Sequence, residues 1–381
     1  MMNIPRMLSQ KILDLVPKGK IILMSGPRQA GKTHLSQKLF APVDFVYLNF
    51  DDPDDRVTIR ERSWPKDVRA VLFDELHKMD KWKTWLKALY DKGSGPPLIV
   101  TGSARMETFK KGGDSLAGRH FHFRLHPLML GELLETGIWK EREALDRLME
   151  FGGFPEPLIE GDPTFLKLWH KSHIHQIIKE DILDLEKVRE LKKIELLIEL
   201  LSQRVGSRIS YASLAQSLEV SPHTVKHWLQ ILENLYVVFK LLPFTRKLPS
   251  SLLKSPKYYF FDTSQVRGGP GAKLENLVAS QLLAQTQFLE DTLGESVRLH
   301  FLADKQKHEV DFAIIKNERV DSLIEVKLSD RHPSPSLKYF SRYLRPRLAL
   351  QALYDQGQEK HFDHLKILSV EKALLETITL P

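Results

Sequence analysis

Nine residues near the start of the chain have the types and spacing of a phosphate-binding loop. They read SGPRQAGKT, from Ser25 to Thr33, and fit the pattern G-x-x-x-x-G-K-[ST]. Glycines let a backbone fold closely around a polyphosphate, while the lysine reaches the outer phosphates and the threonine hydroxyl can ligate Mg²⁺. We expect a bound nucleotide to contact Gly26, Pro27, Arg28, Gln29, Ala30, Gly31, Lys32, Thr33 and His34.

Two acids that follow a later apolar run could complete this chemistry. Asp74 and Glu75 end the stretch AVLFDE. Asp74 would hold Mg²⁺ together with Thr33, and Glu75 would polarise an attacking water as a general base. An apolar strand that ends in two acids is a weak signal by itself, but here it follows a phosphate-binding loop. The pair therefore predicts hydrolysis of the bound nucleotide.

Two further side chains are candidates for sensing or stabilising charge on the phosphates. Ser103, in the small-residue tip of the stretch 97–105, would lie between Asp74 and the terminal phosphate, with Thr101 as the second choice. A plain strand-ending turn is the alternative. Arg119 follows a glycine-rich loop and could stabilise a transferring phosphoryl group, in its own site or across a subunit boundary. A surface arginine is the competing interpretation.

The surrounding elements would bring these residues to one edge of a sheet. Residues 1–18 predict an amphipathic lead-in helix, and apolar strands are expected at 19–24 and 45–50 as well as before Asp74 and Ser103. Their alternation with helices predicts a doubly wound parallel sheet with the nucleotide at the carboxyl ends of its strands. The acidic run 51–55 fits solvated turn chemistry better than a place near the Mg²⁺.

The composition excludes several classes of protein. The 381 residues contain no cysteine, which excludes disulfides and thiolate zinc sites. No apolar run approaches the ~18 residues of a spanning helix, and we see no secretory signal. We therefore expect a cytoplasmic protein that does not interact with membranes.

A helix-turn-helix pattern lies between residues 209 and 233. Both helices have an inward apolar face, and Ser221 with Pro222 forms an N-cap and first turn. A wing strand is expected at 236–242. Residues 201–260 hold eight Lys/Arg and two Glu, a surplus of +6 out of the chain's +7. A module that only packs against protein is the alternative to DNA binding. The residues expected to contact DNA are His223, Thr224, Lys226, His227, Arg246 and Lys247.

Four polar residues of the last third could form a second acidic site. Glu275 stands in a predicted helix and Asp311 on a predicted strand, while Glu325 and Lys327 share a face of the next strand. Carboxylates suit Mg²⁺, with Asp311 and Glu325 as ligands, and the lysine could position water for phosphodiester cleavage. Because E-x-K on a strand is common, only the combination supports this interpretation.

The order of these motifs resembles the archaeal and bacterial AAA-type P-loop ATPases that carry a C-terminal domain of unknown function with a restriction-endonuclease-like core. The resemblance implies ATP as the nucleotide, Asp74 and Glu75 as the Walker B acids, and self-association up to a hexamer. The turn 304–308 departs from the family, where we expect a glycine or small polar turn. The motifs that carry the resemblance are the phosphate loop, the Asp-Glu strand, SLAGR at 115–119, GGFPEP at 152–157, the helix-turn-helix, G-x-x-x-E-N at 271–276, and the E-V-D and E-V-K strands.

The expected fold class is α/β. It comprises a P-loop ATPase domain at 1–132, a helical lid or linker at 133–200, a winged helix at 201–250 and an endonuclease-like α/β domain at 251–381. The first functional hypothesis is an ATP-hydrolysing protein that acts on DNA, with metal-dependent cleavage as a separate prediction. The alternative is a regulatory ATP-dependent switch whose C-terminal domains bind a protein partner and do not cleave DNA.

Overall fold

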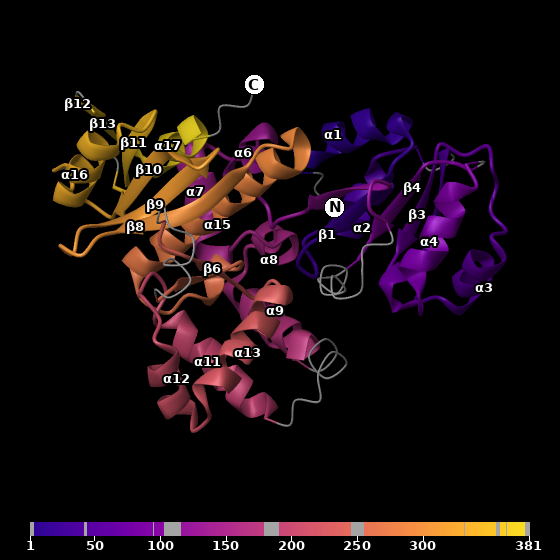
Figure 1. Cartoon of the computed structure of the whole chain (residues 1–381), viewed down its shortest axis with the longest axis horizontal. Helices are drawn as coiled ribbons and strands as arrows, with labels where there is room; N and C mark the ends of the chain where they lie inside the picture. The colour runs from indigo at the N-terminus through magenta and orange to yellow at the C-terminus, as the bar shows by residue number, and fades with distance from the viewer. Residues whose placement is uncertain are drawn as a thin grey trace. The chain divides into compact units, whose positions relative to one another are not determined.

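The structure of the chain is a computed structural model (Figure 1). It describes residues 4 to 377, apart from 42–43, 94, 103–115, 179–189, 245–254, 331, 356–358 and 363. The chain divides into two units. The first is formed chiefly by Asn3–Leu128, and the second by Met129–Glu233 and Val237–Pro381. Each unit has its own core and is described by itself. None of the described helices is both long and apolar enough to span a membrane.

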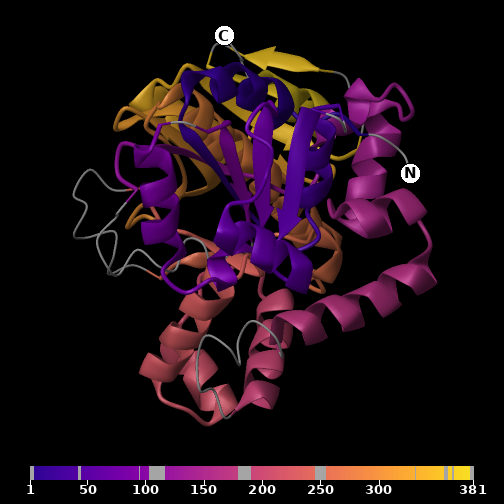
Figure 2. The same ribbon diagram turned by 90° about the vertical axis from the view of Figure 1, so that its right-hand side faces the viewer.

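The first unit is built on a five-stranded sheet in the order β2-β3-β4-β1-β5, with all neighbouring strands parallel. Figure 2 shows these strands, in indigo to purple, side by side. The predicted parallel sheet is confirmed. Every residue of β1, β3 and β4 is buried, as continuous apolar runs require in a parallel sheet. The elements are α1 (Leu8–Leu15), β1 (Ile21–Ser25), α2 (Lys32–Lys38), β2 (Phe45–Asn49), α3 (Pro53–Glu61), β3 (Ala70–Asp74), α4 (Trp82–Asp91), β4 (Leu98–Thr101) and β5 (His120–Arg124).

The acidic run 51–55 serves to start a helix. The Asp52 side chain accepts hydrogen bonds from the backbone N–H groups of Asp54 and Asp55, and so caps α3. Asp51 instead pairs with Lys78 at 2.6 Å. These contacts agree with the prediction that the acidic run forms a solvated turn and does not lie near the Mg²⁺.

The second unit begins with helices and a small sheet. Strand β6 pairs antiparallel with β7, and an isolated bridge joins Arg208 to Lys257 at the start of β7. Residue 250, the predicted domain boundary, therefore falls between two paired strands. The elements are α6 (Leu130–Glu135), α7 (Glu141–Phe151), α8 (Pro155–Glu160), α9 (Pro163–Gln176), α11 (Leu191–Ser202), α12 (Tyr211–Leu218), α13 (Pro222–Asn234), β6 (Val238–Leu241) and β7 (Lys257–Phe260).

The same unit ends in a six-stranded mixed sheet in the order β12-β13-β11-β10-β9-β8. β8, β9 and β10 are antiparallel neighbours, whereas β10, β11 and β13 run parallel. Helix α15 contacts β8 to β10, and α16 contacts β9 to β11 (Figure 1). The elements are α15 (Pro270–Leu293), β8 (Val297–Ala303), β9 (Glu309–Lys316), β10 (Arg319–Lys327), α16 (Pro335–Leu344), β11 (Leu348–Leu353), β12 (Lys360–Phe362), β13 (Leu365–Ser369) and α17 (Val370–Thr377).

Candidate functional site

The predicted phosphate loop connects β1 to α2 and closes around its own lysine. Gly26 has a φ of +151°, and a Cβ there would lie 2.2 Å from the carbonyl oxygen of Leu125, so only glycine fits. Gly31 is left-handed, with a φ of 94°, directly before the helix. The Lys32 ammonium donates to the carbonyl oxygens of Gly26 and Pro27 at 3.0 and 2.6 Å. The loop therefore holds a buried cation at the position where the motif binds phosphate.

Arg6 supports this loop, although the sequence does not suggest it. Its guanidinium donates to the carbonyl oxygen of Ala30 at 2.9 Å and to that of His126 at 2.6 Å. Arg6 thus fixes the loop backbone from the N-terminal segment. No local pattern could have revealed this, because its partners lie 24 and 120 residues away.

Asp74, at the end of β3, accepts hydrogen bonds from three hydroxyl groups. Thr33 donates at 2.6 Å and Tyr47 at 3.0 Å to one carboxylate oxygen, and Thr101 donates at 2.6 Å to the other. Parallel pairing explains the convergence, because Asn49, Asp74 and Thr101 lie in register at the ends of neighbouring strands. A carboxylate beside the loop threonine has the oxygen donors that Mg²⁺ prefers, so these residues fit the predicted ion.

Tyr47 is the member of this set that the sequence analysis missed. Burial and the neighbouring charge of Asp74 raise the pKa of its phenol well above the usual range, so it stays a donor. Its position on β2, two residues before the strand ends, was the available signal.

Glu75 lies beside this site in a strained backbone conformation. Its φ is 53°, which is uncommon for a residue with a side chain and is frequent at functional positions. Burial raises the pKa of its carboxyl above the ordinary value of 4.5, and Asp74 adds to the shift, although Lys78 opposes it at 3.7 Å. A raised pKa makes the carboxylate a stronger base at neutral pH.

The remaining predicted catalytic residues are not part of the described site. Ser103 and most of the glycine-rich loop lie outside the described residues. Arg119 directly precedes β5 and pairs with Asp91 at 2.7 Å. It therefore stands at the amino end of a five-residue strand, about 16 Å from the loop edge at ~3.3 Å per residue. This placement contradicts a role in its own site, whereas a role across a subunit boundary stays a prediction.

The four residues of the second predicted site do come together in the C-terminal sheet. Lys327 pairs with Glu325 at 2.9 Å, and the backbone N–H of Val326 donates to Asp311 at 2.9 Å. Burial raises the pKa of Asp311 well above its usual range, and the negative charges of Glu275 and Glu325 raise it further. We call Glu275, Glu309, Asp311 and Glu325, with Lys257 and Lys327, the acidic cluster.

Lys257, the first residue of β7, places a buried positive charge within the acidic cluster. Its ammonium lies 2.8 Å from Glu309, 3.4 Å from Glu275 and 3.9 Å from Asp311, and its side chain is only 2% exposed. Burial works to lower its pKa, but the three carboxylates outweigh burial and raise it. The signal in the sequence was a lysine heading the apolar run KYYFF.

The Lys257 ammonium therefore already occupies the acidic cluster in which a metal ion is predicted at Asp311 and Glu325. Among the described residues, no three His, Asp or Glu side chains are grouped so as to hold a metal ion. One buried oxygen of Glu325 nevertheless has no hydrogen-bond partner, which suits an added cation. Metal binding at these residues stays a prediction.

The basic segment 201–260 has fewer free charges than its composition suggests. Lys257 is buried in the acidic cluster, Arg208 pairs with Glu309 at 2.6 Å, and Lys240 pairs with Glu233 at 2.9 Å. On α13, Lys226 is exposed, as are His223 and His227, and Thr224 is half-buried at the Ser221 cap. The predicted contacts Arg246 and Lys247 lie outside the described residues.

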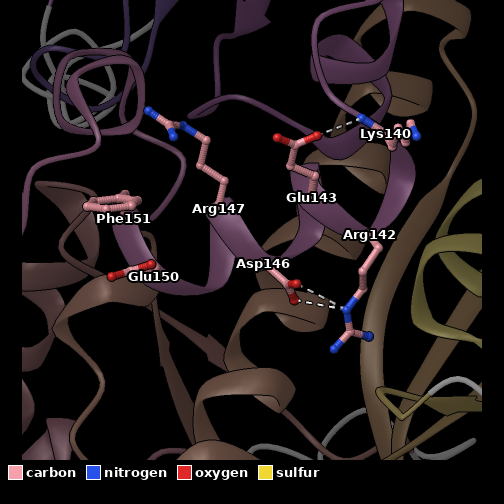
Figure 3. Close-up of a pocket in the computed structure, with 7 residues that line it drawn as sticks. All are labelled: Lys140, Arg142, Glu143, Asp146, Arg147, Glu150 and Phe151. Atoms are coloured by element: carbon pink, nitrogen blue, oxygen red, sulfur yellow. Dashed lines mark hydrogen bonds and ion pairs between the residues drawn. The ribbon is translucent and has the colours of Figure 1, made fainter.

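The described pockets add no reaction chemistry. Residues of α7 line a cavity of about 430 Å³, where Figure 3 shows Arg142 and Asp146 turned toward each other. A second cavity of about 470 Å³ contains His170. The Nε2 atom of His170 contacts both Asp262, at 2.9 Å, and Ser264, at 2.8 Å. A Ser-His-Asp relay needs the two ring nitrogens separately, so this trio is a structural contact.

Three family matches cover consecutive parts of the chain. Residues 18–134 match a family described as "AAA domain", and residues 142–267 and 270–371 match two domains of unknown function, DUF8612 and DUF4143. The first match, together with the phosphate loop and Asp74, supports an AAA-type ATPase domain with nucleotide-binding residues in the first unit.

The similar proteins add little beyond this. An uncharacterized protein of Methanocaldococcus jannaschii, MJ1544, is 25% identical over 91% of this chain and 85% of its own length. An uncharacterized protein of Haemophilus influenzae is 24% identical over 84% of this chain and 89% of its own. Among solved structures, the Walker-type ATPase PABY2304 of Pyrococcus abyssi matches 68% of this chain and 93% of its own at 14% identity, with a TM-score of 0.40. At that score, the structural likeness carries no functional argument.

Proposed function

We propose that this chain binds ATP with Mg²⁺ at the phosphate loop and hydrolyses it. The observation that carries the proposal is the 2.6 Å hydrogen bond from Thr33 to Asp74, with Glu75 next in the chain. Thr33 and Asp74 would hold Mg²⁺, and the ion would neutralise negative charge on the phosphates. Thr101 and Tyr47 keep the Asp74 carboxylate oriented, Lys32 binds the outer phosphates, and Glu75 accepts a proton from the attacking water.

Two variants test this assignment. Lys32→Ala should abolish ATP binding, whereas Lys38→Ala, an exposed lysine at the other end of α2, should leave it unchanged. Glu75→Gln should bind ATP with the parental affinity and lose at least about 100-fold in turnover, the scale of a general base. Equal turnover in Glu75→Gln and the parent would remove Glu75 from the base role.

We further propose that the second unit acts on DNA through a winged helix formed by α11 to α13 with β6 and β7. The order of these elements and the exposed His223, Lys226 and His227 on α13 support this. Duplex binding should weaken steeply with salt, and Lys226→Gln should make the log–log slope shallower by about 0.9. No duplex binding at about 50 mM salt would contradict the proposal. The regulatory alternative would then account better for the ATPase.

Metal-dependent cleavage in an endonuclease-like C-terminal domain is a second candidate function, which we expect to be blocked while Lys257 occupies the acidic cluster. The assembled Glu275, Asp311, Glu325 and Lys327, and the unpartnered oxygen of Glu325, favour it. Cleavage would require the Lys257 ammonium to leave the cluster. Plasmid incubated with Mn²⁺ should stay intact with the parent protein if Lys257 remains in place. Cleavage that is lost in both Asp311→Ala and Glu325→Ala would establish the nuclease instead.

We further propose self-association, since a catalytic role for Arg119 would require the site of a neighbouring subunit. Light scattering in the presence of ATP should give a mass above the 44.0 kDa of one chain. Arg119→Ala should then lower turnover while ATP binding is kept. A monomer with full ATPase activity would contradict this role.

A further inference from the structure

Exposed cations of the second unit gather on a surface that the proposed function does not use. Lys338, Arg342 and Arg345 lie on α16 and at its C-terminal end, and Lys305 and Lys307 lie in the turn between β8 and β9. None of the five forms an ion pair with a described acidic side chain, in contrast to Arg208, Lys240 and Lys257. These five positive charges have no ion-pair partner among the described residues, and the Asp304 carboxylate of the same turn contacts His308 instead.

Three aromatic rings lie among these cations. His308 stacks on Tyr339 with ring centres 4.3 Å apart and planes at 14°. Tyr339 and Tyr343 are one helical turn apart, with ring centres at 6.3 Å and planes at 1°. Tyr343 is 73% exposed and Tyr339 is 40% exposed, which is unusual for large aromatic residues. We call His308, Tyr339 and Tyr343 the ring stack.

Rigid elements hold the ring stack in place. The Asp304 carboxylate accepts from the backbone N–H of His308 at 2.9 Å and contacts its Nδ1 at 2.8 Å. Helix α16 is anchored by Leu337 and Phe340, which are buried in the core of the C-terminal sheet. Helix α16, labelled in Figure 1, therefore presents the exposed tyrosines from a fixed support.

We propose that the ring stack and its five cations bind single-stranded nucleic acid. Exposed parallel rings offer faces on which unpaired bases stack, while flanking Lys and Arg neutralise the phosphates. The bases of a duplex are stacked on one another, so a duplex would gain only the electrostatic attraction between the cations and its phosphates. The inference rests on the proposed action on nucleic acid and deepens it by naming the strand form and the surface. The surface also adjoins the acidic cluster, because Glu309 follows His308 and its N–H donates to Ser336 of α16.

Binding of labelled 20-nucleotide single-stranded DNA and RNA, followed by fluorescence anisotropy, tests the proposal. Tyr343→Ala should weaken binding about tenfold, within the ~1–3 kcal/mol that stacking of one base provides, and Tyr343→Trp should keep it. Arg342→Gln should make the log–log salt slope shallower by about 0.7. Phe362→Ala, which removes another exposed aromatic residue of the same unit, is the matched control and should bind like the parent.

The outcomes separate this surface from the winged helix. Lys226→Gln should weaken binding of duplex DNA and leave single-strand binding unchanged. Single-strand binding that is equal in Tyr343→Ala and the parent overturns the ring stack, even where duplex binding still depends on Lys226. Equal losses in Tyr343→Ala and Phe362→Ala overturn it as well. The DNA and RNA arms decide which of the two strands binds more tightly.

Discussion

Asp74 in the first unit and Asp311 in the second are both carboxylates on sheet strands, but their partners are of opposite kinds. Asp74 accepts hydrogen bonds from the neutral hydroxyls of Thr33, Tyr47 and Thr101. Asp311 lies among other carboxylates, and these charges together with burial raise its pKa well above the usual range, although the ammonium of Lys257 lies 3.9 Å away. Neutral donors orient a carboxylate and leave its charge for an incoming cation, whereas a buried lysine offsets part of that charge.

This difference separates a site prepared for a metal from a site that the chain fills itself. In the first unit the cation of the loop, Lys32, is held by backbone carbonyls and not by Asp74. In the second unit a single residue of β7 holds three acids from α15 and β9 together. The ATPase chemistry therefore follows from the first site, and any metal chemistry in the second depends on Lys257.

Removing the lysine charge should have the largest effect. Lys257→Met keeps the length of the side chain but leaves buried carboxylates uncompensated, so the free energy of unfolding should fall by about 3–5 kcal/mol at pH 7. Urea denaturation measures this. Mn²⁺ should raise the Tm of the variant and leave that of the parent unchanged, because the metal can replace the ammonium.

Lys240→Met is the matched control for that prediction. Lys240 pairs with Glu233 but keeps a third of its side chain exposed, so its loss should cost about 1 kcal/mol or less. If Lys257→Met is as stable as the parent protein, the lysine does not hold the acidic cluster together.

Thr101→Val should have the next largest effect, on turnover. It removes a buried donor to the Asp74 carboxylate, and hydrogen bonds to charged groups contribute about 1.5–3 kcal/mol, so kcat should fall roughly 10- to 100-fold. Steady-state ATPase assays measure this. Thr58→Val, whose hydroxyl bonds only to the backbone of α3, should have the parental kcat. An unchanged kcat in Thr101→Val would mean that Asp74 needs no support from β4.

Tyr47→Phe should have a smaller effect on the same reaction. The Tyr47 hydrogen bond is longer, at 3.0 Å, and shares its carboxylate oxygen with Thr33. We expect a loss of about 3- to 10-fold in kcat, from roughly 0.5–1.5 kcal/mol. A loss as large as that of Thr101→Val would rank the two donors equally.

Glu309→Gln should have the smallest effect, on how stability declines at acid pH. Burial works to raise the pKa of Glu309, but Lys257 and Arg208 outweigh burial and lower it below the ordinary 4.5. Its contribution is therefore present above the unfolded pKa and is lost as pH falls through the folded pKa. Glu309→Gln should lower the Tm slightly at pH 7 and give a shallower decline toward pH ~3. Parallel curves for variant and parent would contradict this.

Local patterns predict the central residues of both sites but not the side chains that support them. SGPRQAGKT and AVLFDE are contiguous, and parallel pairing fixes which strand ends meet, so Thr33, Asp74 and Glu75 could be predicted. Arg6 could not, because its contacts depend on how distant segments pack, and the signal for Tyr47 was only its place near the end of a predicted strand. The helices α12 and α13 also followed from local apolar spacing and the Ser221 cap.

The net charge of a segment predicts a DNA-binding face less reliably than a contiguous motif predicts the phosphate loop. The surplus of +6 in residues 201–260 predicts a DNA-binding face, yet Arg208 and Lys257 pair with Glu309, which lies outside that segment. Five further cations without acidic partners lie on α16 and in the turn 304–308, and the sequence marks that turn only as a departure from the family. A net charge reports the excess of cations over anions in a segment and does not say which cations face solvent.

The number of Mn²⁺ ions bound per chain tests the contrast between the two sites most directly. We would titrate Mn²⁺ and follow the free ion by electron paramagnetic resonance, with and without a non-hydrolysable ATP analogue. The account predicts about one Mn²⁺ per chain, bound only with the nucleotide and lost in Lys32→Ala. A second Mn²⁺ that binds without nucleotide and disappears in Asp311→Asn would contradict it, because the acidic cluster would then take a metal while Lys257 is present.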